Sequence, residues 1–239
     1  MANLGAALAH QLDTEVVACD LALESGHLAL MLDARPTHTI DELITRYESS
    51  FELDVLIAYL SSTQYRVRLL AAPASPASAP LVTVDGVRAA IEQLRTRFPY
   101  VLLDLAPTFS DINLAAMEMA DLVLLVTVPE MAGVRATAAA LEILDSLGYP
   151  PERSQVLVNT VFAAKPLAAS DLASALERPV SLSIPYDRNA FVDALNRGIP
   201  VVKSSPRSPA ARAFTELAQE LAEGSGSRSG ARAPATTAV

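Results

Sequence analysis

Short apolar segments alternate along this chain with longer segments of helical periodicity. The apolar runs lie at 15–19, 65–71, 100–105, 121–128, 155–161 and 180–184. Most are continuously apolar, which is typical of parallel strands covered by helices on both faces. Helical patterns occur at 2–12, 40–47, 52–61, 84–97, 110–119, 131–147, 169–177, 188–197 and 208–223. The alternation predicts an α/β fold with a mostly parallel sheet, right-handed crossovers and helices on both faces.

One domain and one tail are expected. Residues 1–223 should form a single α/β domain, because 51% of the 239 residues are apolar and can build a large core. Residues 224–239 (GSGSRSGARAPATTAV) are of low complexity. We expect this tail to be disordered, since it offers little apolar surface to bury. No apolar run is long enough for a transmembrane helix.

The charge balance and cysteine usage limit the classes of partner. The formal net charge is −9, and the Lys and Arg residues are scattered. Direct nucleic-acid binding is not expected, because phosphate contacts need a concentrated basic patch. The single Cys19 excludes an internal disulfide and fits a reducing cytosol. The start of the chain lacks the positive region of a signal peptide, so we expect a cytoplasmic location.

Two carboxylates end predicted strands. YVLLDLAP (100–107) places Asp104 at the C-terminal edge of a parallel strand, where open α/β sheets bind ligands. Asp20 ends the segment EVVACD, on the strand expected beside it. If the two converge on one crevice, they would form a site for Mg²⁺ beside a phosphate. Either carboxylate alone is also typical of a cap on the next turn or helix.

Further polar residues follow other predicted strands, but a phosphate loop is missing. Asn159 ends one strand, and Pro185-Tyr186-Asp187 follows the next, so these loops could line a nucleobase pocket at the same edge. In nucleotide-binding α/β domains a glycine-rich loop ending in Lys-Ser/Thr precedes the first helix and holds the phosphates. Here only Met1 precedes that helix.

In order along the chain, these segments resemble the MinD/ParA superfamily of deviant P-loop ATPases, which have the SIMIBI-class fold. ANLGAALAHQL is similar to the helix after the P-loop, and VVACDLALESGHLALMLD to the strand and switch segment. FPYVLLDLAPTFSDINLAAMEMADLVLLVTVPE resembles the Walker B and switch II region. LVNTV and SIPYDRNAFVDALNRGIPVV resemble the adenine-side loops and closing helix. GHLALMLD, LLAAP and the ALNRG block are most similar to the CpaE/TadZ branch of pilus-assembly localisation proteins.

The resemblance implies ATP and Mg²⁺ as cofactors and assigns roles to five residues. Asp20 corresponds to the first switch carboxylate near the Mg²⁺-bound waters, and Asp104 to the Walker B carboxylate. Asn159 corresponds to the adenine-contacting asparagine, and Pro185 and Asp187 flank the base. The branch also implies a homodimer, partners in pilus or secretion-system assembly, and a place at the cell pole or the inner membrane face through those partners.

This sequence departs from the family pattern at several positions. The lysine-rich loop (KGGxGK) is absent, Ala22 replaces the second switch Asp, and Ala106 and Thr108 replace the Pro and Gly of switch II. A methyl group cannot accept a proton or orient a water, so we expect slow hydrolysis or none. Loss of the central strand before the loop would strip hydrogen-bond partners from both its neighbours. We therefore favour a late start codon or a fragment over a natural pseudo-ATPase.

The favoured hypothesis is a positioning or scaffold protein for pilus or secretion-system assembly, with a degenerate or truncated ATP site. The alternative is an active ParA/MinD-type partitioning or division-site ATPase clipped at its N-terminus. That alternative predicts a basic surface or a cationic amphipathic helix, and neither is evident. A phospho-receiver domain with Asp104 as acceptor would need an acidic pair on an earlier strand. The nitrogenase iron protein, also of this superfamily, would need bridging cysteines. Whether the chain is an active enzyme stays open.

Overall fold

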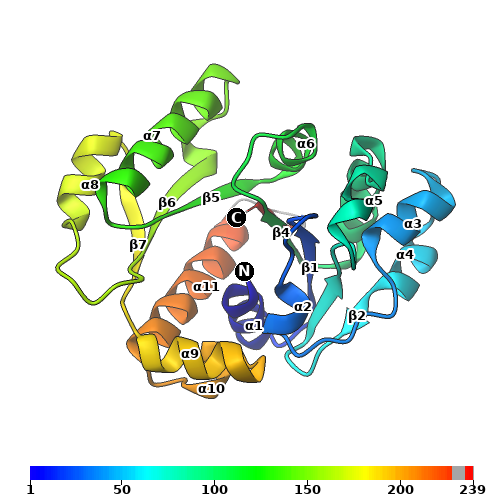
Figure 1. The fold of residues 1–239 in the computed structure, drawn as a ribbon, viewed down its shortest axis with the longest axis horizontal. Coiled ribbons are helices and arrows are strands. Elements are labelled where there is room, and N and C mark those ends of the chain that lie inside the picture. The colour runs from blue at the N-terminus through cyan, green and yellow to red at the C-terminus, as the bar shows by residue number, and fades with distance from the viewer. Residues whose placement is uncertain (228–234, 239) are drawn as a thin grey trace.

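The computed structural model describes residues 1–227 and 235–238, and its described part forms one sheet between two layers of helices (Figure 1). The strand order is β2-β3-β1-β4-β8-β5-β6-β7. All pairs are parallel except β2 with β3. The predicted α/β class is thus confirmed. The strands are β1 (Val16–Leu21), β2 (Ser61–Ser62), β3 (Val67–Leu70), β4 (Tyr100–Leu105), β5 (Leu122–Thr127), β6 (Ser154–Asn159), β7 (Val180–Ile184) and β8 (Ala235–Ala238).

Helices cover both faces of this sheet, as the apolar pattern predicted. One face carries α3 (Ile40–Tyr47), α4 (Leu53–Tyr59), α5 (Val84–Arg97), α6 (Asp111–Met119), α7 (Met131–Ser146) and α8 (Ala169–Leu176). The other carries α1 (Ala2–Gln11), α2 (Leu28–Met31), α9 (Arg188–Arg197), α10 (Val201–Ser204) and α11 (Pro209–Ser227). Short 3-10 helices lie at Pro76–Leu81 and Pro151–Arg153. In Figure 1, α1 and α11 lie side by side below the sheet, and these two helices pack together.

The alternation of side chains along β1 explains why its sequence is continuously apolar. Val17 and Cys19 point into the core under α3–α6, whereas Val16 and Ala18 point into the core under α1 and α11. Every residue of β1 is buried. Since both faces are covered, neither set of positions tolerates exposed polar side chains, and the strand loses the two-residue alternation of a half-exposed sheet.

The expectation of a disordered tail over residues 224–239 is wrong for its described part. Residues 224–227 end α11, and residues 235–238 form β8, a parallel strand between β4 and β5. Residues 228–234 and 239 lie outside the described part. The expectation failed because it considered only how much apolar side-chain surface the segment could bury. Here the backbone of a low-complexity segment satisfies the hydrogen-bonding groups of two strand edges that would otherwise be left open.

Candidate functional site

Asp20 and Asp104 lie opposite one another at the carboxyl edge of the sheet. β1 and β4 are parallel neighbours, and their register pairs Asp20 directly with Asp104. Adjacent strands are about 4.8 Å apart, so the two carboxylates lie side by side at this edge. The structure therefore brings together the two acids that the sequence placed on neighbouring strand ends. Their role as metal ligands stays a prediction.

Asp20 is a buried carboxylate with incomplete hydrogen bonding. It is 2% exposed, and its Oδ2 accepts a hydrogen bond from the backbone N–H of Leu28 at 3.0 Å. Its Oδ1 is buried and has no hydrogen-bond partner among the described residues. A Cβ on Gly26 would lie 2.6 Å from both carboxylate oxygens, so a glycine lets the loop close over the acid. Burial, reinforced by Asp104, raises the pKa of Asp20 to about 6, although the Leu28 N–H opposes the rise.

Asp104 is half-buried, and burial also raises its pKa, with a smaller opposing effect from the α-amino group of Met1. Ionising two neighbouring, partly buried carboxylates is unfavourable, and a bound divalent cation would offset that cost. No group of three or more His, Cys, Asp or Glu side chains with metal-site geometry occurs in the described residues. A cation at this pair would therefore keep several waters, which is how Mg²⁺ binds to one or two carboxylates.

Asn159, Pro185 and Asp187 form a second group at the same edge. The register pairs Asn159 with Ile184 at the ends of β6 and β7, so Pro185 follows directly beside it. Asp187 stands at the N-cap of α9 without making a capping bond, and its Oδ2 is buried without a partner among the described residues. β8 and β5 separate β4 from β6, so three strand spacings, roughly 14 Å, divide this group from the carboxylate pair.

Asn113 is a site residue that the sequence analysis missed. It is 2% exposed in the first turn of α6, and its Nδ2 donates to the carbonyl oxygens of Ala106 at 2.8 Å and Thr108 at 2.7 Å. These bonds fix the loop that leaves Asp104. The sequence's signal for this role is an Asn three residues after the Ser110 cap, at the start of a helix that follows the strand of Asp104.

We expect Asn113→Ala to lower the free energy of unfolding by about 2 kcal/mol, because two hydrogen bonds are lost and two carbonyls are released. Urea denaturation measures this loss. The matched control is Ser110→Ala, which removes only the N-cap bond and should cost about 1 kcal/mol. An Asn113→Ala loss no larger than the control would show that the loop does not depend on the amide.

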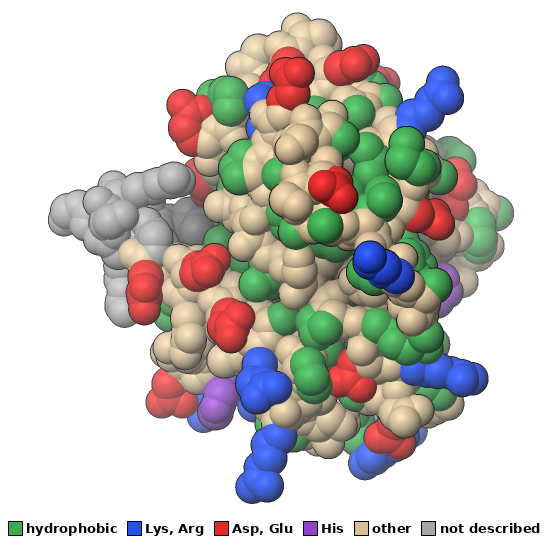
Figure 2. All heavy atoms as spheres, turned by 90° about the vertical axis from the view of Figure 1, so that its left-hand side faces the viewer, with side chains coloured by type: hydrophobic (Ala, Val, Ile, Leu, Met, Phe, Trp, Pro, Cys, Tyr) green, Lys and Arg blue, Asp and Glu red, His purple; other side chains and the backbone are tan. Residues whose placement is uncertain are grey.

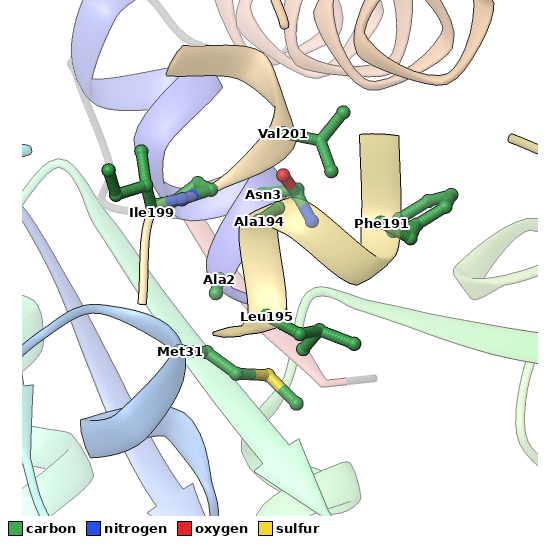
Figure 3. Close-up of a pocket in the computed structure, with 9 residues that line it drawn as sticks. Ala2, Asn3, Met31, Phe191, Ala194, Leu195, Ile199 and Val201 are labelled. Atoms are coloured by element: carbon green, nitrogen blue, oxygen red, sulfur yellow. The ribbon is translucent and has the colours of Figure 1, made fainter. Parts of the chain in front are cut away.

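Of two cavities in the described part of the chain, one is lined by Asp104 and the other by none of the predicted site residues. The larger, of about 410 Å³, is within the usual range for ligand pockets. Apart from Asp104, Thr108 and Thr137, its lining is apolar: Leu105, Ala106, Pro107, Phe109, Met117, Val123, Leu124, Leu125, Val126, Ala136 and Ala140. The smaller, of about 30 Å³, lies where the start of α1 meets α2, α9 and α10 (Figure 3). In that view Asn3 points toward Ala194 and Val201, and the space suits a water rather than a nucleobase.

The described residues therefore fit a Mg-nucleotide only in part. The carboxylate pair suits a hydrated divalent cation, and Asn159 with the unpartnered oxygen of Asp187 offers polar atoms to a base. Among the described residues, no Lys or Arg lines the larger cavity beside Asp104. Phosphate binding needs cationic or backbone N–H donors. No hydrolytic step follows from these residues.

The chain is similar in sequence and in fold to MinD and ParA proteins of known structure or function. The MinD septum site-determining protein of Thermotoga maritima is 26% identical over 228 residues, which cover 92% of this chain and 81% of that protein. A ParA family ATPase from Chlorobium tepidum has a TM-score of 0.84 at 21% identity, covering 92% of this chain and 90% of the other. MinD complexed with Mg-ADP from Pyrococcus horikoshii has a TM-score of 0.81 at 22% identity, covering 96% and 91%. No protein-family model matches the chain.

The architecture, a mostly parallel sheet between helical layers, is thus that of the P-loop ATPase class. Within that class the chain has the MinD/ParA ATPase fold.

Proposed function

We propose that this chain is a MinD/ParA-like positioning or scaffold protein of the CpaE/TadZ type, acting in pilus or secretion-system assembly with little or no ATP hydrolysis. The observation that carries the proposal is the combination of residues at the sheet edge. Asp20 and Asp104 remain paired in a MinD/ParA fold, while Ala22 follows at the place where a second switch carboxylate would stand. A site of this kind can hold a cation, but it has no group at position 22 to accept a proton from water.

The surface supports a protein partner rather than a nucleic acid. On the face of α7, α8, β7 and α9, Lys and Arg side chains lie scattered among Asp and Glu, with apolar side chains between them (Figure 2). The net charge of −9 points the same way. No helix in the described part of the chain combines the length and apolar character needed to cross a bilayer. We propose a homodimer in the cytoplasm, held at the pole or the inner membrane face by its partners.

A second candidate is an active division-site or partitioning ATPase. The similarity to a MinD septum site-determining protein favours it. The two candidates differ in what Asp104 does: a turnover enzyme needs its cation ligand for catalysis, whereas a scaffold uses it at most for binding.

We expect wild-type protein to hydrolyse Mg-ATP no faster than the Asp104→Asn variant, because nothing at position 22 activates water. Phosphate release, measured with and without lipid vesicles or DNA, checks this. Wild-type turnover well above that of Asp104→Asn would favour the active ATPase. The scaffold role is tested in cells, where deleting the gene should displace fluorescently labelled pilus components. Unchanged positions of those components would exclude it.

A further inference from the structure

We propose that the turn joining α10 to α11 is a docking surface for an acidic segment of a partner protein, in which Asp or Glu side chains follow an extended backbone. Three side chains make up this surface: Lys203 in α10, Arg207 in the turn and Arg212 in the first turn of α11. We call it the cationic turn. It includes none of the residues of the sheet edge, so this inference does not depend on nucleotide or cation binding there.

The first observation is the local charge. Residues 194–215 contain four cationic side chains and no Asp or Glu, in a chain whose formal net charge is −9. One of the four, Arg197, pairs with Asp193 at 2.9 Å. The three side chains of the cationic turn are exposed, and none has an acidic partner within ion-pair distance in the described part of the chain. An uncompensated group of cations favours an anionic partner, and arginine binds carboxylates through two parallel hydrogen bonds.

The second observation is that hydrogen bonds fix the backbone that carries these cations. Pro206 and Arg207 stand at the centre of a β-turn. A hydrogen bond of 2.9 Å from the N–H of Ser208 to the carbonyl of Ser205 closes it. Proline is favoured at the first central position because its φ is already set. The hydroxyl of Ser208 also accepts a hydrogen bond from the N–H of Ala211 at 3.1 Å, which caps α11.

The residues on either side of the turn are anchored in the core. Val201 of α10 and both Ala210 and Ala211 of α11 are 0% exposed and belong to one apolar cluster. In Figure 1, α9, α10 and the start of α11 lie together at one end of the molecule, and these helices pack against one another. A preorganised surface loses less conformational entropy on binding, so more of the ion-pair energy contributes to affinity.

The third observation limits the width of the partner. Glu216 and Glu220 follow Arg212 by four and eight residues in α11, and all three are exposed. They therefore lie on the same face of the helix, one and two turns further along. A nucleic-acid duplex or a lipid bilayer is broad and would also meet these acids, which repel phosphates. A single extended acidic chain is narrow enough to lie on the cationic turn alone.

The test measures binding of a fluorescein-labelled peptide in which Glu alternates with Ser, as long as the segment 203–212, by fluorescence anisotropy at low salt. Arg207→Glu should weaken binding by about tenfold, because it places a like charge at the tip of the turn. Arg135→Glu, on α7, is the matched control. It changes the net charge equally at an exposed arginine without an ion pair among the described residues, and the dissociation constant should stay within about twofold of wild type.

A second variant and a second peptide make the test independent of one substitution. Lys203→Glu lies in a separate helix and should weaken binding to a similar degree, so the test stays decisive even if Arg207→Glu fails to fold. A peptide with Gln in place of every Glu should not bind. Bound Glu peptide should slow hydrogen exchange at 203–212, which locates the contact.

Four outcomes would overturn the proposal. The first is that wild-type protein does not bind the Glu peptide, and the second is that the Gln peptide binds equally well. The third is equal weakening by the α7 control and by the variants of the cationic turn, since binding would then follow net charge alone. The fourth is tighter binding of duplex DNA or phosphatidylserine vesicles than of the peptide, lost in Arg207→Glu, since the cationic turn would then serve a phosphate surface.

Discussion

Asp20→Asn is expected to stabilise the protein by about 3 kcal/mol at pH 8. Burial raises the pKa of Asp20 to about 6, against an ordinary value of 3.8, so its charged form destabilises the folded state. At 1.36 kcal/mol per pKa unit, the difference corresponds to about 3 kcal/mol. Asparagine can still accept the hydrogen bond from the Leu28 N–H. Urea denaturation of the two proteins measures the effect.

The sign of the pH dependence follows from the direction of the shift. Between pH 3.8 and about 6 the folded protein binds more protons at Asp20 than the unfolded chain does. Wild-type stability from this group therefore falls as the pH rises through that range and is lowest above it. The difference between Asp20→Asn and wild type should be close to zero at pH 4 and complete at pH 8. A stabilising substitution at Asp20 would fit the prediction that this carboxylate serves a binding function at the expense of stability.

Asp13→Asn is the matched control for this prediction. Asp13 is exposed and pairs with Arg66 on the surface, where an ion pair contributes little. Its φ of 49° is a conformation that asparagine also tolerates. This variant should differ from wild type by a few tenths of a kcal/mol at pH 8. If Asp20→Asn behaves like Asp13→Asn at pH 8, Asp20 is not a destabilising charge.

Thr237→Pro is expected to lower the free energy of unfolding by about 3 kcal/mol or more. β8 lies between β4 and β5, so a proline in it removes a backbone donor from the middle of the sheet and restricts φ. Total stabilities of domains are only about 5–15 kcal/mol, so the loss should be plain in urea or thermal denaturation.

Thr237→Val provides the control at the same position. It keeps the backbone donor and the β-branched shape, and it replaces a hydroxyl that is buried on an apolar face. We expect it to match or exceed wild type in stability. Equal midpoints for the proline and valine variants would mean that residues 235–238 add nothing to the folded sheet. The low-complexity interpretation of the tail would then be right after all.

Local patterns were sufficient for the six strands and nine helices expected from the sequence, because each strand is a short apolar run and each helix has a helical period. The run YVLLDL forms β4 from Tyr100 to Leu105, as predicted, and the helical pattern at 84–97 forms α5 with the same bounds. The short α2 and α10 went unpredicted, since four residues are too few to show a period. The juxtaposition of Asp20 and Asp104 was also predictable, since parallel neighbours end at the same sheet edge.

What the sequence determined by itself is the α/β class, the positions of most elements and the two acids at the sheet edge. Only the tertiary structure decided three further points: that Ala235–Ala238 becomes a central strand, that Asn113 fixes the loop after Asp104, and that an apolar cavity adjoins that acid. The physical reason is the sequence separation between the residues that interact. Periodicity and caps depend on neighbours a few residues away, whereas β8 exists because two strands more than a hundred residues upstream left backbone groups open between them.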